Sequence, residues 1–348
     1  MTGFAAPFEI RHAPLRQYCE VVFSGHDHYR SIELQYLEIS RKRRGFVVLL
    51  NTKGEGLDVL SEPSLSLDEE WCRNDPSVSD YRLGRVETVE LKGAFLKSGA
   101  DGVDARVSFQ DHAGRQIDMA VASAASGPAK SRNLFVPANP KPKVSMLWFL
   151  YLFEFGPLRF SDKIDIRIDG QPIKPNKWPW PIRPWPYVQG RYANDIAFFS
   201  LNPPAATSMP MVDNDDAFDL VPIDGAAMPA IRSWTKREQG HDLEARFDPP
   251  LSTIDGSGQA IAGNGTFAMA IDGMDIAKGR YQLSSADGQT ELAFTDVNQY
   301  WRPPEKDFSV WMLEFYHRLK AGRRRWHWTA TMRPSDDQIC CDGGWVLR

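Results

Sequence analysis

The chain has 348 residues, of which 42% are hydrophobic and 25% are charged, and its formal net charge at pH 7 is -4. This composition permits a sizeable core and excludes a general electrostatic attraction to nucleic acid or anionic lipid. We therefore expect no nucleic-acid partner. Two basic runs, 41–44 and 323–325, are expected to be solvated turns between strands.

Cysteine usage and the apolar runs bear on the compartment. Four cysteines do not make a disulfide framework in a chain this long, and the adjacent Cys340 and Cys341 cannot form an unstrained bridge, so we expect reduced thiols. The first residues lack the features of a signal peptide. The most apolar run, 144–155, is too short for a membrane helix and contains Glu154. We expect a cytoplasmic protein without an integral membrane segment.

Short strand-like runs follow one another through the first half of the chain. Strands are predicted at 21–23, 31–39, 46–50, 85–96, 103–110, 116–122 and 163–168. The runs 103–110 and 116–122 are joined by turn residues, so they are expected to form a hairpin. The run 144–155 lacks alternation, which predicts a strand that is buried on both faces.

A segment rich in proline and tryptophan, 174–187, separates the two halves of the chain. Proline at this density excludes both a helix and a central strand, so we expect an ordered, extended crossing segment followed by irregular chain. Strand signals resume at 230–237, 242–247, 266–271, 279–284 and 291–297. No amphipathic helix longer than about three turns is predicted.

The strictest alternation lies in the run 309–332, which predicts a hairpin that turns at Ala321–Gly322 and pairs Phe315 with Trp328. One face is then apolar: Trp311, Leu313, Phe315, His317, Trp326, Trp328, Ala330 and Met332. The other face carries Met312, Glu314, Tyr316, Arg318, Arg325, His327 and Thr329.

The candidate catalytic residues are Glu314, Tyr316 and His327, which share the polar face of this predicted hairpin. If that face lines a cavity, burial raises the pKa of the glutamate, which could then protonate a substrate. If the face is wet, the same residues form an ordinary polar surface.

Aromatic residues are candidates for the wall of an apolar ligand pocket, although they could equally pack against their own domain. The candidates are Trp148, Phe149, Trp178, Trp180, Trp185 and Trp301. We predict no metal site: His26 and His28, with Glu33 five residues on, have the spacing of metal ligands but also fit a surface loop. Cys72 has acidic neighbours, which raise a thiol pKa, so a structural role is expected.

The segment Glu20-Val21-Val22-Phe23-Ser24-Gly25, followed by a turn and the predicted strand 31–39, resembles the opening of the AttH-type lipocalin-like proteins, which include the carotenoid hydratases. Val21 and Val22 stand where that family has paired tryptophans. The resemblance implies two consecutive lipocalin-like β-barrels, an architecture that suits the length of this chain and its two strand-rich halves.

We predict an all-β protein of two consecutive lipocalin-like antiparallel β-barrel or sandwich units, 1–175 and 211–348, joined by an ordered connector, 176–210. The leading functional prediction is binding, and acid-catalysed hydration, isomerisation or cyclisation, of a hydrophobic molecule such as an isoprenoid or polyketide, without a cofactor. The alternatives are a carbohydrate-active or carbohydrate-binding β-sandwich and a non-catalytic binding protein.

Overall fold

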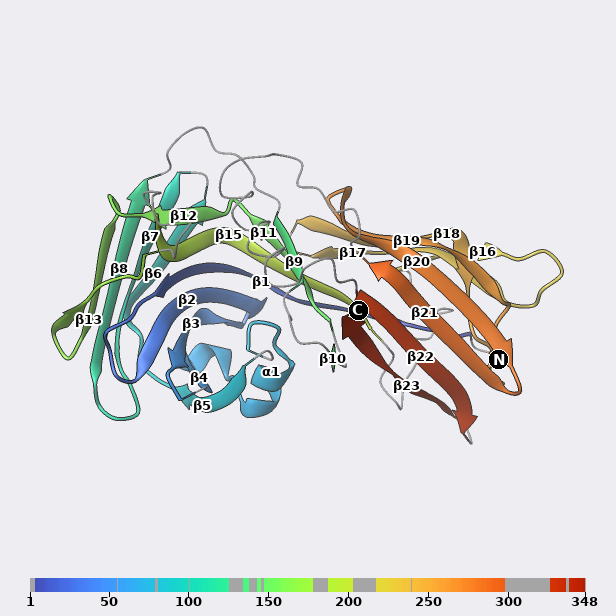
Figure 1. Ribbon diagram of the computed structural model, residues 1–348, viewed down its shortest axis with the longest axis horizontal. Helices are drawn as coiled ribbons and strands as arrows, with labels where there is room; N and C mark the ends of the chain where they lie inside the picture. The colour runs from blue at the N-terminus through green and yellow to red at the C-terminus, as the bar shows by residue number, and fades with distance from the viewer. Residues whose placement is uncertain are drawn as a thin grey trace.

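The computed structural model describes residues 4–54, 56–78, 81–99, 101–124, 134–137, 143–144, 147–177, 187–202, 217–238, 240–297, 326–335 and 338–347. Nearly all the regular structure in these ranges is β (Figure 1). The helical elements among them are a single 3₁₀ turn, η1 (Pro63–Leu65), and a short α-helix, α1 (Glu69–Asn74). The all-β prediction is therefore confirmed.

The first sheet has nine strands and is the backbone of the N-terminal half. In spatial order its main path is β5 (Arg82–Thr88), β4 (Gly56–Ser61), β3 (Arg43–Thr52), β2 (Tyr29–Ser40), β1 (Glu9–Val22), β15 (Tyr187–Asn202), β11 (Phe149–Phe153) and β9 (Leu134–Pro137). The short strand β12 (Gly156–Arg159) also pairs with β15. The pairing of β4 with β5 is parallel, and the others are antiparallel.

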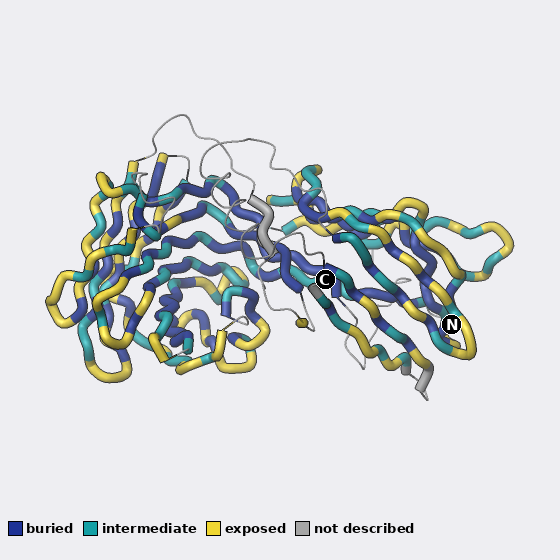
Figure 2. Tube along the Cα trace, viewed as in Figure 1, coloured by how far each residue is buried: buried dark blue, intermediate teal, exposed yellow. Residues whose placement is uncertain are grey.

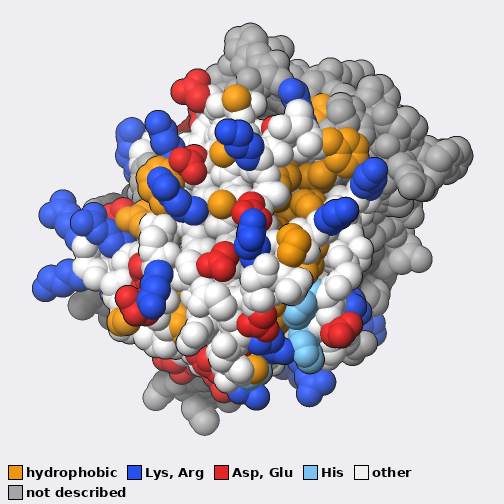
Figure 3. Space-filling model, turned by 90° about the vertical axis from the view of Figure 1, so that its left-hand side faces the viewer, with side chains coloured by type: hydrophobic (Ala, Val, Ile, Leu, Met, Phe, Trp, Pro, Cys, Tyr) orange, Lys and Arg blue, Asp and Glu red, His pale blue; other side chains and the backbone are white. Residues whose placement is uncertain are grey.

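The second sheet has five strands and packs against β1–β4. Its order is β14 (Gln171–Ile173), β13 (Lys163–Ile168), β8 (Gln116–Ala124), β7 (Gly102–Gln110) and β6 (Lys92–Gly99). The predicted hairpin is confirmed as β7 and β8, and the inward-facing residues of β7, such as Val107 and Phe109, are buried. Figure 3 shows acidic and basic side chains interspersed over this end of the molecule, as expected for a face in contact with water.

The third sheet has nine strands and forms the C-terminal half. Its order is β10 (Lys143–Val144), β23 (Gln338–Leu347), β22 (Trp326–Ser335), β21 (Gln289–Val297), β20 (Met274–Ala286), β19 (Gly263–Ile271), β18 (His241–Ser252), β17 (Pro229–Glu238) and β16 (Phe218–Pro222). Within the described strands all three sheets are open paths with free edges, which favours the sandwich form of the prediction.

Two long strands, β1 and β15, run through both halves of the molecule (Figure 1). The start of the chain lies in the C-terminal half, where Ala5 bridges to Ile254 and the Phe8 ring packs 5.1 Å from that of Phe247. Residues 187–202, inside the predicted connector, form β15, which pairs with β1 in the first sheet. The two halves are thus joined by strands that they share.

Strand β11 is buried on both faces, which confirms the prediction made from its missing alternation (Figure 2). Phe149 and Tyr151 belong to the core beneath the third sheet, which we call the C-terminal core. Leu152 faces the other way and packs with neighbouring Trp148 and with Phe198 of β15. A strand between two apolar clusters has no wet side and therefore no need for polar residues.

The register predicted for the hairpin 309–332 is wrong where the structure describes it. Trp328 of β22 pairs with Phe294 of β21 on one edge and with Trp345 of β23 on the other. A strand has only two edges, so the predicted pairing of Trp328 with Phe315 cannot form. Alternation identified the inward face of β22 correctly, with Trp326 and Trp328 buried in the C-terminal core, but it did not identify the neighbouring strands.

Candidate functional site

A pocket of about 370 Å³ lies where β1 passes from one half of the molecule to the other, and we call it the junction pocket. Strand β1, helix α1 with the residues that follow it, and one tryptophan line it. These residues are Ile10, Arg11, His12, Ala13, Pro14, Trp71, Asn74, Asp75, Pro76 and Trp148.

Helix α1 places Trp71 at this pocket. The Asp68 side chain caps the helix by accepting a hydrogen bond from the backbone N–H of Trp71 at 2.7 Å, and two glutamates occupy the first turn, where acidic groups suit the helix dipole. Cys72 belongs to an apolar cluster on β2–β4, and Trp71 packs against the edge of the same cluster. Burial, followed by the charge of Asp75, raises the pKa of Cys72 to about 12, so the thiol is protonated, as expected for a structural cysteine.

A buried ion pair fixes the chain that follows α1. Arg16 of β1 donates two hydrogen bonds to the Asp75 carboxylate, at 2.8 and 2.9 Å, and the two side chains are only 1% and 2% exposed. Arg16 also donates to the Ser77 hydroxyl at 2.7 Å, and its guanidinium lies over the Phe198 ring. Such a pair is stable only with good geometry and further hydrogen bonds, and both are present here. It holds the wall made by Asp75 and Pro76 against the sheet.

Further polar side chains continue from this pair across the same face of the first sheet. Arg16 reaches the Gln35 amide oxygen at 3.4 Å, and the Gln35 amide donates to Glu33 at 2.6 Å. Glu33 lies opposite Glu20, which accepts from Arg191 at 2.8 Å. Burial and the charge of Glu20 raise the pKa of Glu33 to about 7, so this acid retains a proton near neutral pH.

Most polar groups of the junction pocket already have protein partners. Arg11 pairs with Glu9 at 2.6 Å, and the Asn74 amide donates to the Glu70 carbonyl at 2.9 Å. The Asp75 carboxylate is occupied by Arg16. The surfaces left for a ligand are therefore mainly apolar, those of the two tryptophans, the two prolines and Ile10.

His12 stands apart from the other polar groups of the pocket. Its Nε2 lies 2.7 Å from the Lys236 Nζ of β17 and 3.9 Å from a Glu238 oxygen. Its Nδ1 is buried and has no hydrogen-bond partner among the described residues. Burial, followed by the nearby ammonium of Lys236, lowers the pKa of His12, so the imidazole is neutral at pH 7.

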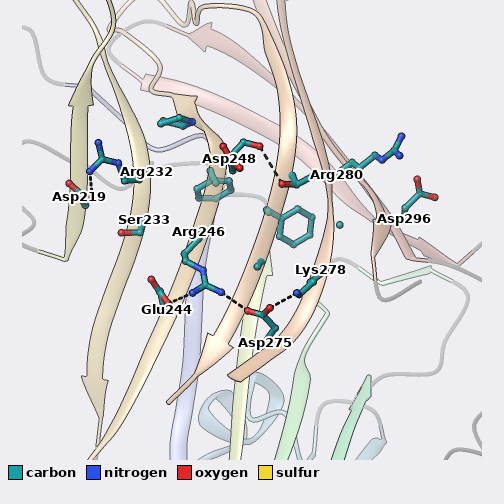
Figure 4. A pocket seen from close by; sticks show the side chains of 16 residues that line it. Asp219, Arg232, Ser233, Glu244, Arg246, Asp248, Asp275, Lys278, Arg280 and Asp296 are labelled. Carbon is teal, nitrogen blue, oxygen red and sulfur yellow. Dashed lines mark hydrogen bonds and ion pairs between the residues drawn. The ribbon is translucent and has the colours of Figure 1, made fainter. Parts of the chain in front are cut away.

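A second hollow, of about 870 Å³, crosses the outer face of the third sheet (Figure 4). Its floor includes Phe247 and Phe267, and its walls are charged. Most of the charged side chains in these walls form ion pairs with one another. Arg246 contacts Glu244 at 3.1 Å, and Asp275 pairs with both Arg246 and Lys278. Arg232 pairs with Asp219. A charged ligand would have to displace these pairs, so the junction pocket is the stronger candidate.

The residues predicted from sequence fall in different places. Trp148 lines the junction pocket, whereas Phe149 is fully buried in the C-terminal core, at the edge of the Trp345 ring. His327 lies on β22 opposite Val346, on the face that points away from that core. Trp178, Trp180, Trp185, Trp301, Glu314 and Tyr316 lie outside the described residues.

The alternative metal reading of His26 and His28 gains no support. The Nδ1 atom of His26 accepts the backbone N–H groups of His28 and Tyr29, both at 3.3 Å, and its ring stacks on Tyr29. These contacts describe a histidine that closes a turn. Among the described residues no three His, Cys, Asp or Glu side chains gather closely enough to hold a metal ion.

Comparisons with family models, with curated proteins and with solved structures found no match to this chain. The resemblance of residues 20–39 to the AttH-type lipocalin-like proteins therefore stays a prediction. In the described part of the chain, no helix combines the length and the apolarity needed to cross a bilayer.

Sequence reasoning missed His12, Arg16, Trp71 and Asp75. One available signal was the position of Arg16 in a strand, two residues from both Pro14 and Tyr18, where an arginine between apolar side chains of the same face needs a buried partner. The partner itself carried no signal, because Asp75 lies in irregular chain 59 residues away.

Proposed function

We propose that this protein binds a small hydrophobic molecule in the junction pocket. The observation that carries the proposal is a recess between Trp71 and Trp148 whose wall is held in place by the buried Arg16–Asp75 pair. A rigid wall lowers the entropy lost on binding, and aromatic faces give a small ligand a large apolar contact. A volume of about 370 Å³ suits a ligand of one or two rings or a short isoprenoid chain.

The hydrophobic ligand is favoured over a carbohydrate because of the hydrogen bonds already made inside the pocket. A sugar needs several free donors and acceptors, and its own hydroxyls lose water on binding. Arg11, Asn74 and Asp75 already make hydrogen bonds or ion pairs with other protein groups. An apolar ligand makes no such demand.

Acid-catalysed hydration, isomerisation or cyclisation of the bound molecule is the second part of the proposal. Glu314 is the proposed proton donor, and Tyr316 and His327 are the other residues that we propose to take part. A protonated carboxyl group and a dry, shaped cavity are sufficient for such chemistry, and no cofactor is required.

Binding can be measured with a fluorescent lipophilic probe whose uptake quenches tryptophan emission. Trp71 is half-buried, so Trp71→Ala should fold, and it should weaken probe binding about tenfold or more because it removes one aromatic wall. Phe160→Ala is the matched control, since Phe160 is 45% exposed and does not line this pocket.

If Trp71→Ala is folded by circular dichroism and its affinity for the probe is unchanged, the probe does not bind in the junction pocket. A panel of mono- and disaccharides measured on the same variants tests the alternative. Saturable sugar binding that Trp71→Ala abolishes, without any binding of the lipophilic probe, would favour a carbohydrate site.

A further inference from the structure

We propose that the ligand of the junction pocket carries an oxygen acceptor, such as a ketone or aldehyde carbonyl, and that the Nδ1–H group of His12 donates a hydrogen bond to it. This inference rests on the proposed function and narrows its ligand class from a hydrocarbon to a small apolar carbonyl compound.

The protonation state of His12 follows from its contact with Lys236. An ammonium group has donors and no acceptor, so at 2.7 Å the Lys236 Nζ must donate to the Nε2 atom of His12. A neutral imidazole that accepts at Nε2 carries its hydrogen at Nδ1. Lys236 therefore selects one tautomer, and it leaves a hydrogen-bond donor at Nδ1.

That donor has no acceptor within the described protein. The Nδ1 atom is buried, although the side chain as a whole keeps 20% of its exposure, and His12 is one of the residues that line the pocket. A buried N–H group without a partner is unfavourable, and a ligand oxygen that reaches it relieves that cost. Because Nδ1 is covered in the free protein, the proposed hydrogen bond requires the ring to turn toward the ligand while Nε2 keeps its contact with Lys236.

The surroundings favour a neutral acceptor over a carboxylate. Glu238 lies 3.9 Å from the His12 ring and 3.8 Å from Lys236, and Asp75 lines the same pocket. Arg11, the cation of the lining, is already paired with Glu9. A carboxylate on the ligand would be repelled by these two acidic groups and would find no uncommitted cation on the pocket lining. A neutral carbonyl oxygen meets no such repulsion.

Two probes of the same shape isolate this hydrogen bond: 2-acetylnaphthalene, with a carbonyl, and 2-isopropenylnaphthalene, with a methylene group in its place. The wild-type protein should bind the ketone about tenfold more tightly. His12→Phe keeps a ring and removes the donor, so it should bind the two probes equally. A further variant, Lys236→Met, removes a lysine, so it needs a control that loses a lysine elsewhere. Lys278→Met serves as that control, since Lys278 lines the hollow on the third sheet.

Lys236→Met tests the tautomer argument separately. Without the ammonium, Nε2 is free to carry the hydrogen, so the preference for the ketone should fall about threefold or more, while Lys278→Met keeps it. Nitrogen NMR of ¹⁵N-histidine-labelled wild-type protein should show His12 protonated at Nδ1, and this measurement needs no variant to fold.

Each outcome decides between the two proposals. Equal binding of both probes to the wild type overturns the carbonyl inference and leaves the hydrophobic pocket standing. A ketone preference that survives in His12→Phe, or a His12 protonated at Nε2 alone, overturns the assignment of the donor. Failure of the wild type to bind either probe overturns both the inference and the proposed function.

Discussion

Glu33 lies directly opposite Glu20 on neighbouring antiparallel strands, and the two carboxyl groups have different partners. Glu20 is paired with Arg191, whereas Glu33 accepts a hydrogen bond from the neutral amide of Gln35. Like charges at facing positions destabilise a sheet, and a proton retained on one of the two acids removes that repulsion. The pair can be accommodated on this face because Glu33 is the acid that stays protonated.

We predict that Glu33→Gln stabilises the protein at high pH relative to the wild type. The pKa of Glu33 is raised in the folded state to about 7 from its usual value of 4.5, so the folded state binds this proton more tightly than the unfolded state does. Wild-type stability should therefore fall as the pH rises from about 4.5 to about 7, and the glutamine variant should lack that loss. Urea unfolding at several pH values measures the difference. Parallel pH profiles for the two proteins would contradict the prediction, and Glu69→Gln on exposed α1 is the control.

Removal of either partner of the Arg16–Asp75 pair should be strongly destabilising. Arg16→Met or Asp75→Asn leaves an uncompensated charge that is almost fully buried, at a cost of about 3–5 kcal/mol. The double variant Arg16→Met/Asp75→Asn should lose less than the sum of the single losses, because no lone charge remains. Denaturant unfolding of the cycle gives the coupling energy, and strict additivity would show that the pair contributes nothing as a unit.

A second buried carboxylate, Asp111, should link the first two sheets. It accepts hydrogen bonds from the Tyr29 hydroxyl at 2.6 Å and from Arg115 at 2.7 Å. Burial opposes its charged form, but these hydrogen bonds outweigh burial and lower the pKa. Asp111→Ala should cost about 1–3 kcal/mol at pH 7, and the loss should shrink as the pH falls below about 4, where the unfolded chain takes up the proton. An equal loss at pH 7 and pH 3 would contradict this account, and thermal unfolding measures it.

Two glycines of the third sheet should differ in their tolerance of alanine. A Cβ atom at Gly279 would lie 2.5 Å from the Phe267 ring and 2.8 Å from the Thr295 carbonyl oxygen, whereas a Cβ at Gly263 meets nothing within 4 Å. Gly279→Ala should therefore destabilise by about 1–3 kcal/mol, while Gly263→Ala should change stability by about 0.5 kcal/mol or less. Urea unfolding of the two variants would contradict the prediction if both lost the same stability.

The catalytic part of the proposed function predicts that Glu314→Gln abolishes turnover without loss of ligand binding. Glutamine keeps the shape of glutamic acid and cannot donate the acidic proton. Turnover is measured as water addition, isomerisation or ring closure of a co-purifying isoprenoid or polyketide by mass spectrometry. Glu33→Gln is the matched control, since Glu33 is an acid of raised pKa that has no part in the proposed catalysis. An unchanged rate in Glu314→Gln would show that Glu314 is not the proton donor, and only the binding part of the proposed function would remain.

The sequence by itself predicted the all-β class and the faces of several strands, although it missed β4, β15 and β23. Alternation placed Val107 and Phe109 inward on β7, and the residues Asp111–Gly114 fixed the hairpin with β8. The absence of alternation in β11 correctly indicated that this strand is buried on both faces. These features are local, because the direction of each side chain along a strand depends only on the pleat of its own backbone.

Only the tertiary structure decided which strands lie side by side and which polar groups meet. Trp328 keeps the inward face that alternation gives it, but its neighbours are Phe294 and Trp345. In the same way, Arg16 meets Asp75 because α1 folds back over the first sheet, and this placement of α1 also brings Trp71 into one pocket with Trp148. A strand edge offers the same backbone donors and acceptors to any partner, so the choice among partners depends on the packing of the whole chain.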